Sequence, residues 1–276
     1  MNMIKQLQIF LLIAILALGA FVSTSYADKI LFFSPTRVLL NDNDKVEVIN
    51  ISNLSEIARA YKISFQDLVM TEDGITTPVD SFEYSARRMM RFVPREFVLQ
   101  PGDRQSVRIM SRIKSDTPDG EYHTHLRFLE DVTQRNQINE KKEGQGASIA
   151  APLAYEALIP AVLSHGKIET TIGMKDARIS RVADSGNLRI DLSVTREGNG
   201  QGVAFVNTDY VNADGSLTPA TPRRTIYIYR ELSERTKDYN FASLEAGGSA
   251  QKIKLTLYDS PSADARPVQE VVLDIP

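Results

Sequence analysis

Short runs in which apolar and polar side chains alternate dominate this sequence from residue 30 onward. In the first half they include VEVINI at residues 46–51 and YHTHLRFL at residues 122–129. Turn-forming residues separate the runs, for example Glu72-Asp73-Gly74 and Pro101-Gly102-Asp103. A period of two places alternate side chains on one face of a strand. About six short strands at this spacing indicate an antiparallel β-sandwich of roughly 100 residues.

The second half of the chain repeats this pattern with different strands, among them residues 187–196 and 202–211. A chain of 276 residues is also longer than one ordinary domain of about 100 to 150 residues. We therefore predict an all-β fold of two sandwiches, covering residues 28–164 and 165–276. The join is expected near Ser164-His165-Gly166, where an apolar run stops and a glycine lets the backbone change direction.

Residues 1–27 have the order of a secretory signal peptide. Lys5 precedes an apolar run at residues 9–22, and the small-residue pattern Ser25-Tyr26-Ala27 follows. The alternative is a membrane anchor, but a run of about 14 residues is shorter than the ~20 that span a bilayer. We expect cleavage after Ala27, which gives an exported mature chain without a membrane span.

Composition excludes several classes of function. The chain has no cysteine, so disulfides, thiolate zinc sites and cysteine nucleophiles are ruled out. Its 32 basic and 35 acidic residues nearly balance, so the strong positive field that favours nucleic-acid binding is missing. We expect no nucleic-acid partner, and an anionic group would have to be held by a local cluster of basic residues.

One stretch departs from the alternating pattern. Residues 133–146 are polar, rich in charge and glycine, and lack aromatic side chains, which predicts a mobile loop. Residues 147–163 follow as a nearly continuous apolar run whose one charge is Glu156. Such a run at a domain boundary suggests a strand at a sheet edge, which proteins normally protect with charge or proline. The alternative is that both faces of this strand are buried in the sandwich and that Pro152 caps its exposed end.

Five motifs occur in order along the chain: SPTRV (34–38), RFVPR (91–95), LQPGDRQSVRI (99–109), PDGEY (118–122) and IPAV (159–162). Together they resemble the periplasmic chaperones of the chaperone-usher pilus pathway, and the segment lengths are closer to the archaic branch of that family. The resemblance implies two immunoglobulin-like β-sandwich domains at an angle. It also implies pilin subunits and an outer-membrane usher as partners, and a periplasmic location.

The mechanism implied by this resemblance is donor-strand complementation. A pilin subunit lacks its last strand, and the chaperone lends one whose alternate side chains fill the open groove. Here the donated row is predicted to be Ile149, Ala151, Leu153 and Tyr155. The opposite register stays open, because a slip of one residue exchanges the two faces of a strand. The polar leader before this strand is expected to become ordered only on binding.

Family members hold the C-terminal carboxylate of the subunit with a pair of basic residues. Arg37 matches the first of them, since a guanidinium can meet a carboxylate with two parallel hydrogen bonds. The second departs from the family pattern, because the predicted donor strand contains no lysine and Tyr155 occupies the matching place. Arg91, Arg95 and Arg127 are the candidates for the missing charge, although each could equally be a solvated surface residue.

Other chemistries have little support. His123 and His125 share one strand face as a possible metal pair, but the neighbouring residues predict that this face is exposed to solvent. Nucleophile elbows, phosphate loops and HExxH motifs are missing from the sequence, so no enzyme, metal or cofactor is expected. The alternative function is a structural or adhesive immunoglobulin-like surface protein. A chaperone without subunit could also cap its free strand with a second copy of itself.

Overall fold

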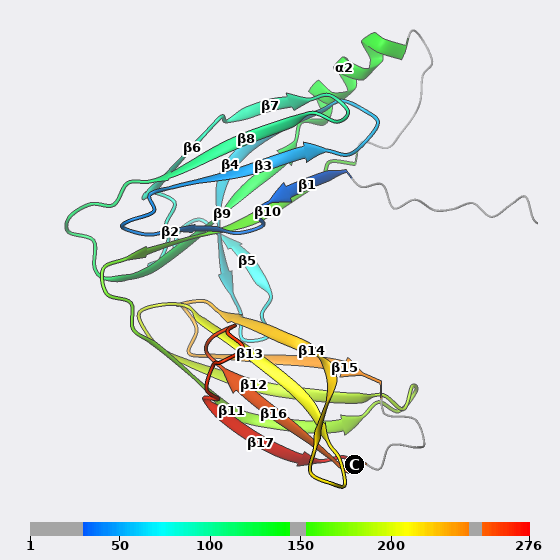
Figure 1. Cartoon of the computed structure of the whole chain (residues 1–276). Coiled ribbons are helices and arrows are strands. Elements are labelled where there is room, and N and C mark those ends of the chain that lie inside the picture. Colours follow the sequence, from blue (N-terminus) through cyan, green and yellow to red (C-terminus); the bar gives the residue numbers. More distant parts are fainter. Residues whose placement is uncertain (1–29, 144–152, 243–249) are drawn as a thin grey trace, which may run out of the picture.

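The computed structural model describes residues 30–143, 153–242 and 250–276 (Figure 1). The predicted signal peptide and the donor residues Ile149 and Ala151 lie outside these ranges. The described part consists of two β-sandwiches that lie at an angle to each other, which confirms the predicted all-β fold class. In the part of the chain described here, no helix is long and apolar enough to cross a membrane.

The first sandwich is built from two mainly antiparallel sheets. One has the strand order β1-β3-β8-β6, and the other has the order β2-β10-β9-β4-β5 with β7 paired to β4. The strands are β1 Leu31–Ser34, β2 Val38–Leu40, β3 Val46–Asn53, β4 Arg59–Met70, β5 Thr76–Val79, β6 Met90–Val93, β7 Glu96–Leu99, β8 Arg104–Ser111, β9 Gly120–Glu130 and β10 Glu156–His165.

The second sandwich pairs a three-stranded sheet of order β11-β12-β15 with a four-stranded sheet of order β14-β13-β16-β17. Its strands are β11 Thr170–Arg181, β12 Leu188–Gly198, β13 Gly202–Val211, β14 Leu217–Ile228, β15 Glu234–Phe241, β16 Lys252–Tyr258 and β17 Gln269–Asp274. Gly166, in the left-handed region at φ 65°, follows β10 and leads into this sandwich.

Each sandwich has its own hydrophobic core. In the first, Ile49 and Ile109 of one sheet belong to the same buried cluster as Phe128 and Ile159 of the other. A separate cluster from residues 174–257 fills the second sandwich. Alternate residues of each strand supply these clusters, as expected for sheets that turn one face inward. The apolar periodicity of the sequence therefore corresponds to two separately packed interiors.

The mobile loop predicted at residues 133–146 is wrong for most of its length, because Val132–Glu143 forms a helix, α2. Asp131 accepts a hydrogen bond from the Gln134 backbone N–H at 3.1 Å, as an N-cap residue does. Further along, the Asn139 side chain donates to the Ala58 carbonyl oxygen at 2.9 Å. The helix is therefore stabilised by a cap and by polar contacts with the sandwich, and an apolar stripe is not needed.

Candidate functional site

Strand β10 has one edge that is paired along its length and one that is largely open. On one side its residues 156–165 pair with β9. On the other side β2 pairs in parallel with Ala161, Val162 and Leu163 only. Among the residues that the structure describes, no strand covers residues 156–160 on this second side. In the described part of the chain, the first half of β10 is therefore a free sheet edge.

The free edge offers unpaired backbone groups. The Tyr155 carbonyl accepts a hydrogen bond from the Glu130 N–H of β9 at 2.9 Å. Because strand residues turn their backbone groups to alternate sides, those of Glu156 and Leu158 point away from β9, toward the open side. Pro160 has no N–H to offer there and contributes a carbonyl oxygen alone. Glu156 and Leu158 could therefore pair with a further strand.

The side chains of this segment form one continuous apolar row. Ala157, Ile159 and Ala161 belong to the core of the first sandwich or pack against it. In the sequence the same alternation continues back to Tyr155 and Leu153, which precede β10 and are 41% and 72% exposed. Because Leu153 and Tyr155 lie beyond the core, the row that fills this sandwich extends into an exposed apolar surface. Leu153 and Tyr155 are two of the four predicted donor residues, and the other two, Ile149 and Ala151, lie outside the described residues.

Arg37 lies between the two sandwiches. Its guanidinium donates a hydrogen bond to the Gln201 side-chain oxygen and lies 4.4 Å from the centre of the Tyr227 ring. Both partners belong to the second sandwich, so Arg37 connects the first sandwich, to which it belongs, with the second. A further basic residue, Arg230, donates to the Glu121 carbonyl oxygen at 3.3 Å. Sequence reasoning missed Arg230, because alternation within residues 224–232 does not reveal that this strand end meets the first sandwich.

The other candidate arginines have different partners. Arg127 forms a two-bond ion pair with Glu156, at 2.9 and 3.1 Å, and this pair raises the pKa of Arg127. Arg91 donates to the Met90 carbonyl oxygen at 2.8 Å, on β6 of the opposite sheet. Arg95 is exposed in the turn between β6 and β7. The four predicted anchor residues therefore lie on three parts of the first sandwich, and Arg37 is the one that contacts the second.

The histidine pair on β9 corrects one expectation. His123 and His125 were predicted to face solvent, yet both are buried. The second sandwich covers this face of the strand: the Tyr229 ring stacks on His123 at 4.2 Å, and His123 Nε2 lies 2.9 Å from a Glu231 oxygen. Periodicity separates the two faces of a strand, but it does not show when another domain covers the second face.

Burial controls protonation at this junction. Burial, together with the charges of His123 and Arg37, lowers the pKa of His125 to about 4. Burial also acts to raise the pKa of Glu231, but the hydrogen bond and charge of His123 outweigh it and leave that pKa lowered. The described residues contain no cluster of three or more His, Cys, Asp or Glu side chains that would suit a metal ion.

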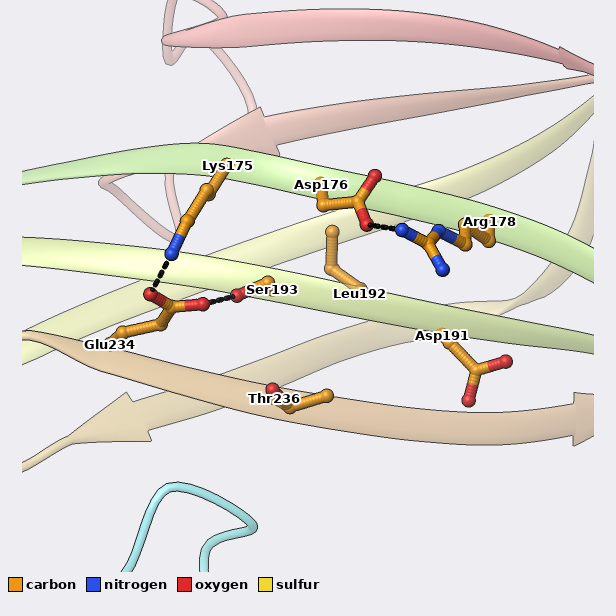
Figure 2. A pocket seen from close by; sticks show the side chains of 8 residues that line it. All are labelled: Lys175, Asp176, Arg178, Asp191, Leu192, Ser193, Glu234 and Thr236. Carbon is orange, nitrogen blue, oxygen red and sulfur yellow. Dashed lines mark hydrogen bonds and ion pairs between the residues drawn. The ribbon is translucent and has the colours of Figure 1, made fainter.

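A hollow on the second sandwich provides a contrast (Figure 2). It lies on the β11-β12-β15 sheet, where Glu234 binds both Lys175 and the Ser193 hydroxyl, and Asp176 lies 3.0 Å from Arg178. The Lys175 contact lowers the pKa of Glu234. Since these opposite charges neutralise one another, this surface is well solvated and offers little apolar area to a partner.

Comparison with known proteins gives no sequence match and several structural ones. No family model matches the chain, and no curated protein matches it. The solved structures similar to it include a chaperone–tip adhesin complex of CFA/I fimbriae biogenesis, with 16% identity and a TM-score of 0.41 over 89% of this chain and 98% of that one. They are structures of chaperones.

Two further matches are of the same kind. The YadV chaperone is 14% identical, with a TM-score of 0.43 over 88% of this chain and 99% of that one. The CsuC–CsuE chaperone–tip adhesion subunit complex, from archaic chaperone-usher Csu pili of Acinetobacter baumannii, gives a match of 12% identity. Its TM-score is 0.43, over 89% of this chain and 97% of that one.

Proposed function

We propose that this chain is a periplasmic chaperone of the chaperone-usher pilus pathway. The observation that carries the proposal is the free edge of β10, where exposed apolar side chains continue a row that fills the core. An exposed apolar sheet edge promotes aggregation unless a partner covers it. A protein that keeps such an edge can use it for strand addition to a partner that lacks one.

In the proposed mechanism, a pilin subunit binds along the first half of β10. The open backbone groups of Glu156 and Leu158 pair with the edge strand of the subunit. Leu153 and Tyr155, together with the predicted donors Ile149 and Ala151, enter the groove that the missing strand leaves open. Burying one large aliphatic side chain such as Leu153 contributes on the order of 1.5–3 kcal/mol. The apolar row therefore contributes most of the affinity, and the backbone hydrogen bonds align the subunit strand with β10.

Arg37 is the proposed anchor for the terminal carboxylate of the subunit. It lies between the sandwiches beside two aromatic rings of the second one, Tyr227 and Tyr229. Arg230 is the basic side chain that the second sandwich contributes at the same junction. A carboxylate bound there would lie next to the closed half of β10 and would fix the position of the subunit along the strand.

The remaining steps of this function follow from the pathway. The chaperone would deliver its subunit to an outer-membrane usher, in a binding cycle that involves no catalysis and no cofactor. Without a subunit, the free edge could pair with a second copy of the chain, which would bury the same apolar row.

Co-expression tests the proposal directly. Small exported subunits encoded in neighbouring reading frames should be recovered as soluble complexes only together with this chain, and Leu153→Glu should abolish the complex. Val272→Glu is the matched control, because Val272 is also exposed, at 51%, but lies on β17 of the second sandwich. An intact complex with Leu153→Glu would refute the proposed function.

Hydrogen exchange gives an independent test in the isolated monomer. A chaperone should exchange the backbone amides of Glu156 and Leu158 rapidly and protect them on binding a subunit. Strong protection of both amides in a monomer would instead indicate that the strand is part of a closed sandwich, as in a structural or adhesive protein. Size measurements at high concentration report whether a second copy covers the edge.

A further inference from the structure

The end of the free edge is held by a buried network of charged side chains. Glu130, the last residue of β9, has a side chain with no solvent exposure. One of its carboxylate oxygens lies 2.8 Å from Arg59 of β4, and the other lies 3.0 Å from Arg135 of α2. Strand β9, the helix that follows it and the distant strand β4 therefore meet at one carboxylate.

This carboxylate also ends the β9–β10 ladder. The Glu130 N–H donates to the Tyr155 carbonyl oxygen at 2.9 Å, as expected for a strand pair. The returning bond differs, because the Tyr155 N–H donates to the Glu130 side chain at 3.2 Å. The Glu130 carboxylate thus takes the place of a backbone carbonyl, and β10 separates from β9 at this residue.

Further contacts hold the backbone just before β10. The Arg135 guanidinium donates to the Leu153 carbonyl oxygen at 3.1 Å from the same nitrogen that binds Glu130. The Arg59 guanidinium lies 4.9 Å from the centre of the Tyr155 ring. The backbone of residues 153–155 is therefore bound to the network, while the Leu153 side chain stays 72% exposed.

We propose that Glu130 and Arg135 are positioning residues that set the register in which β10 is offered to a pilin subunit; this inference rests on the proposed chaperone function. A strand slipped by one residue presents its other face. In that register Ala154 would replace Leu153 in the subunit groove, and most of the buried apolar area would be lost. A buried carboxylate between two guanidinium groups suits this task, because its geometry tolerates little displacement.

The chain has no cysteine, so one introduced thiol is unique in it and can report the register. Leu153→Cys and Ala154→Cys are made separately, and their alkylation rates are measured in the complex with the subunit recovered by co-expression. With the network intact, Cys at position 154 should react at least about tenfold faster than Cys at position 153. Adding Arg135→Gln should reduce this ratio below about threefold. Glutamine keeps a good helix-forming residue in α2 and leaves the Arg59–Glu130 pair in place.

The matched control is Arg189→Gln, which breaks an arginine–carboxylate pair with Asp191 in the second sandwich, away from the subunit site, and should leave the ratio unchanged. A ratio unaffected by Arg135→Gln would overturn the proposal, even if the melting temperature fell, because that would be a structural effect alone. A second measurement needs no subunit: the Tyr155 amide of the free chain should exchange at least about tenfold faster with Arg135→Gln. Unchanged exchange would also overturn it, whereas an intact Leu153→Glu complex would refute the chaperone function instead.

Discussion

Two open sheet edges of this molecule are built in opposite ways. Strand β14 is the edge of the four-stranded sheet in the second sandwich, and it carries Pro219, Pro222, Arg223 and Arg224, with register shifts along its pairing with β13. Proline, charge and bulges each hinder the addition of another strand. The free half of β10 instead carries an apolar row and one charge, Glu156, which is neutralised by Arg127.

The difference shows that an exposed edge is not a general property of this fold. The same chain protects one edge with three devices and leaves another available along its apolar side. Pro160 marks the limit of the available segment, because β2 begins to pair at the next residue, Ala161. On the proposed function this contrast leaves the free half of β10 available for strand addition, and the following predictions test it in order of decreasing effect.

The largest expected effect is a difference in stability between substitutions in the buried half and in the exposed half of the apolar row. Leu163 is fully buried, so Leu163→Ala should lower the free energy of unfolding by about 3 kcal/mol. Leu153 belongs to the same row but is exposed, so Leu153→Ala should cost less than about 0.5 kcal/mol. Chemical denaturation of the isolated protein measures both. Similar costs would mean that the row is buried along its whole length and that the contrast fails.

Lowering the pH should destabilise the protein through the histidines beside the closed half of β10. Val162 pairs with His123, whose neighbour His125 has its pKa lowered to about 4 by burial. The folded state therefore binds fewer protons than the unfolded state, in which the histidine pKa is about 6.5. This stabilisation is complete above pH 6.5 and is lost as the pH falls toward 4. Between pH 7 and pH 5 the free energy of unfolding should fall by roughly 2 kcal/mol.

Denaturation curves at the two pH values measure this loss. His125→Gln should remove most of it, because glutamine does not titrate. An equal pH dependence in the variant would assign the effect to another titratable group at the junction, such as Glu231.

A proline introduced into the free edge should hinder strand addition there, as the prolines of β14 do. The Leu158 N–H points away from β9, so Leu158→Pro removes no hydrogen bond of the β9–β10 ladder. Subunit affinity should fall about tenfold, which is ~1.4 kcal/mol, since one ladder bond is lost and the ring obstructs the approaching strand. Titration with purified subunit gives the affinity, and a melting curve checks the fold. Undiminished affinity would exclude backbone pairing at this residue.

The smallest effect concerns the protected edge. Replacing both prolines of β14, with Pro219→Thr and Pro222→Thr, should change the free energy of unfolding by less than about 1 kcal/mol. It should also introduce weak self-association at high protein concentration, because the edge regains N–H donors. Light scattering detects this association. A variant that stays monomeric would show that the arginines and bulges protect β14 without the prolines.

Most strands could be predicted from the sequence because each has an apolar face. The elements that were not predicted show where this kind of prediction fails. Strand β15, Glu234–Phe241, has the sequence ERTKDYNF, in which charged residues hide the alternation. Helix α2 has no apolar stripe, so its signals were helix-forming side chains after a capping Asp131. Local periodicity reports burial against a core, and elements held by polar contacts escape it.

The residues of the candidate site also fall into those that the sequence identified and those that it missed. The apolar segment that contains Leu153 and Tyr155 stood out in the sequence, because composition alone identified it. Glu130 and Arg135 did not, because their roles depend on contacts with Arg59, about 70 residues earlier in the chain, and with the backbone of residue 153. The junction around His123 was missed for a similar reason, since its cover comes from a different domain.

The apolar alternation of the sequence runs from the exposed residues Leu153 and Tyr155 into the buried residues of β10, so the packing of the core and the exposed surface depend on one spacing. A one-residue insertion between Tyr155 and Ala157 would leave Ile159 and Leu163 in place and would rotate every earlier side chain to the other face. The hydrophobic core would be kept, but the recognition surface would be lost. In this segment, insertions and deletions should therefore be tolerated less well than substitutions that keep its apolar character.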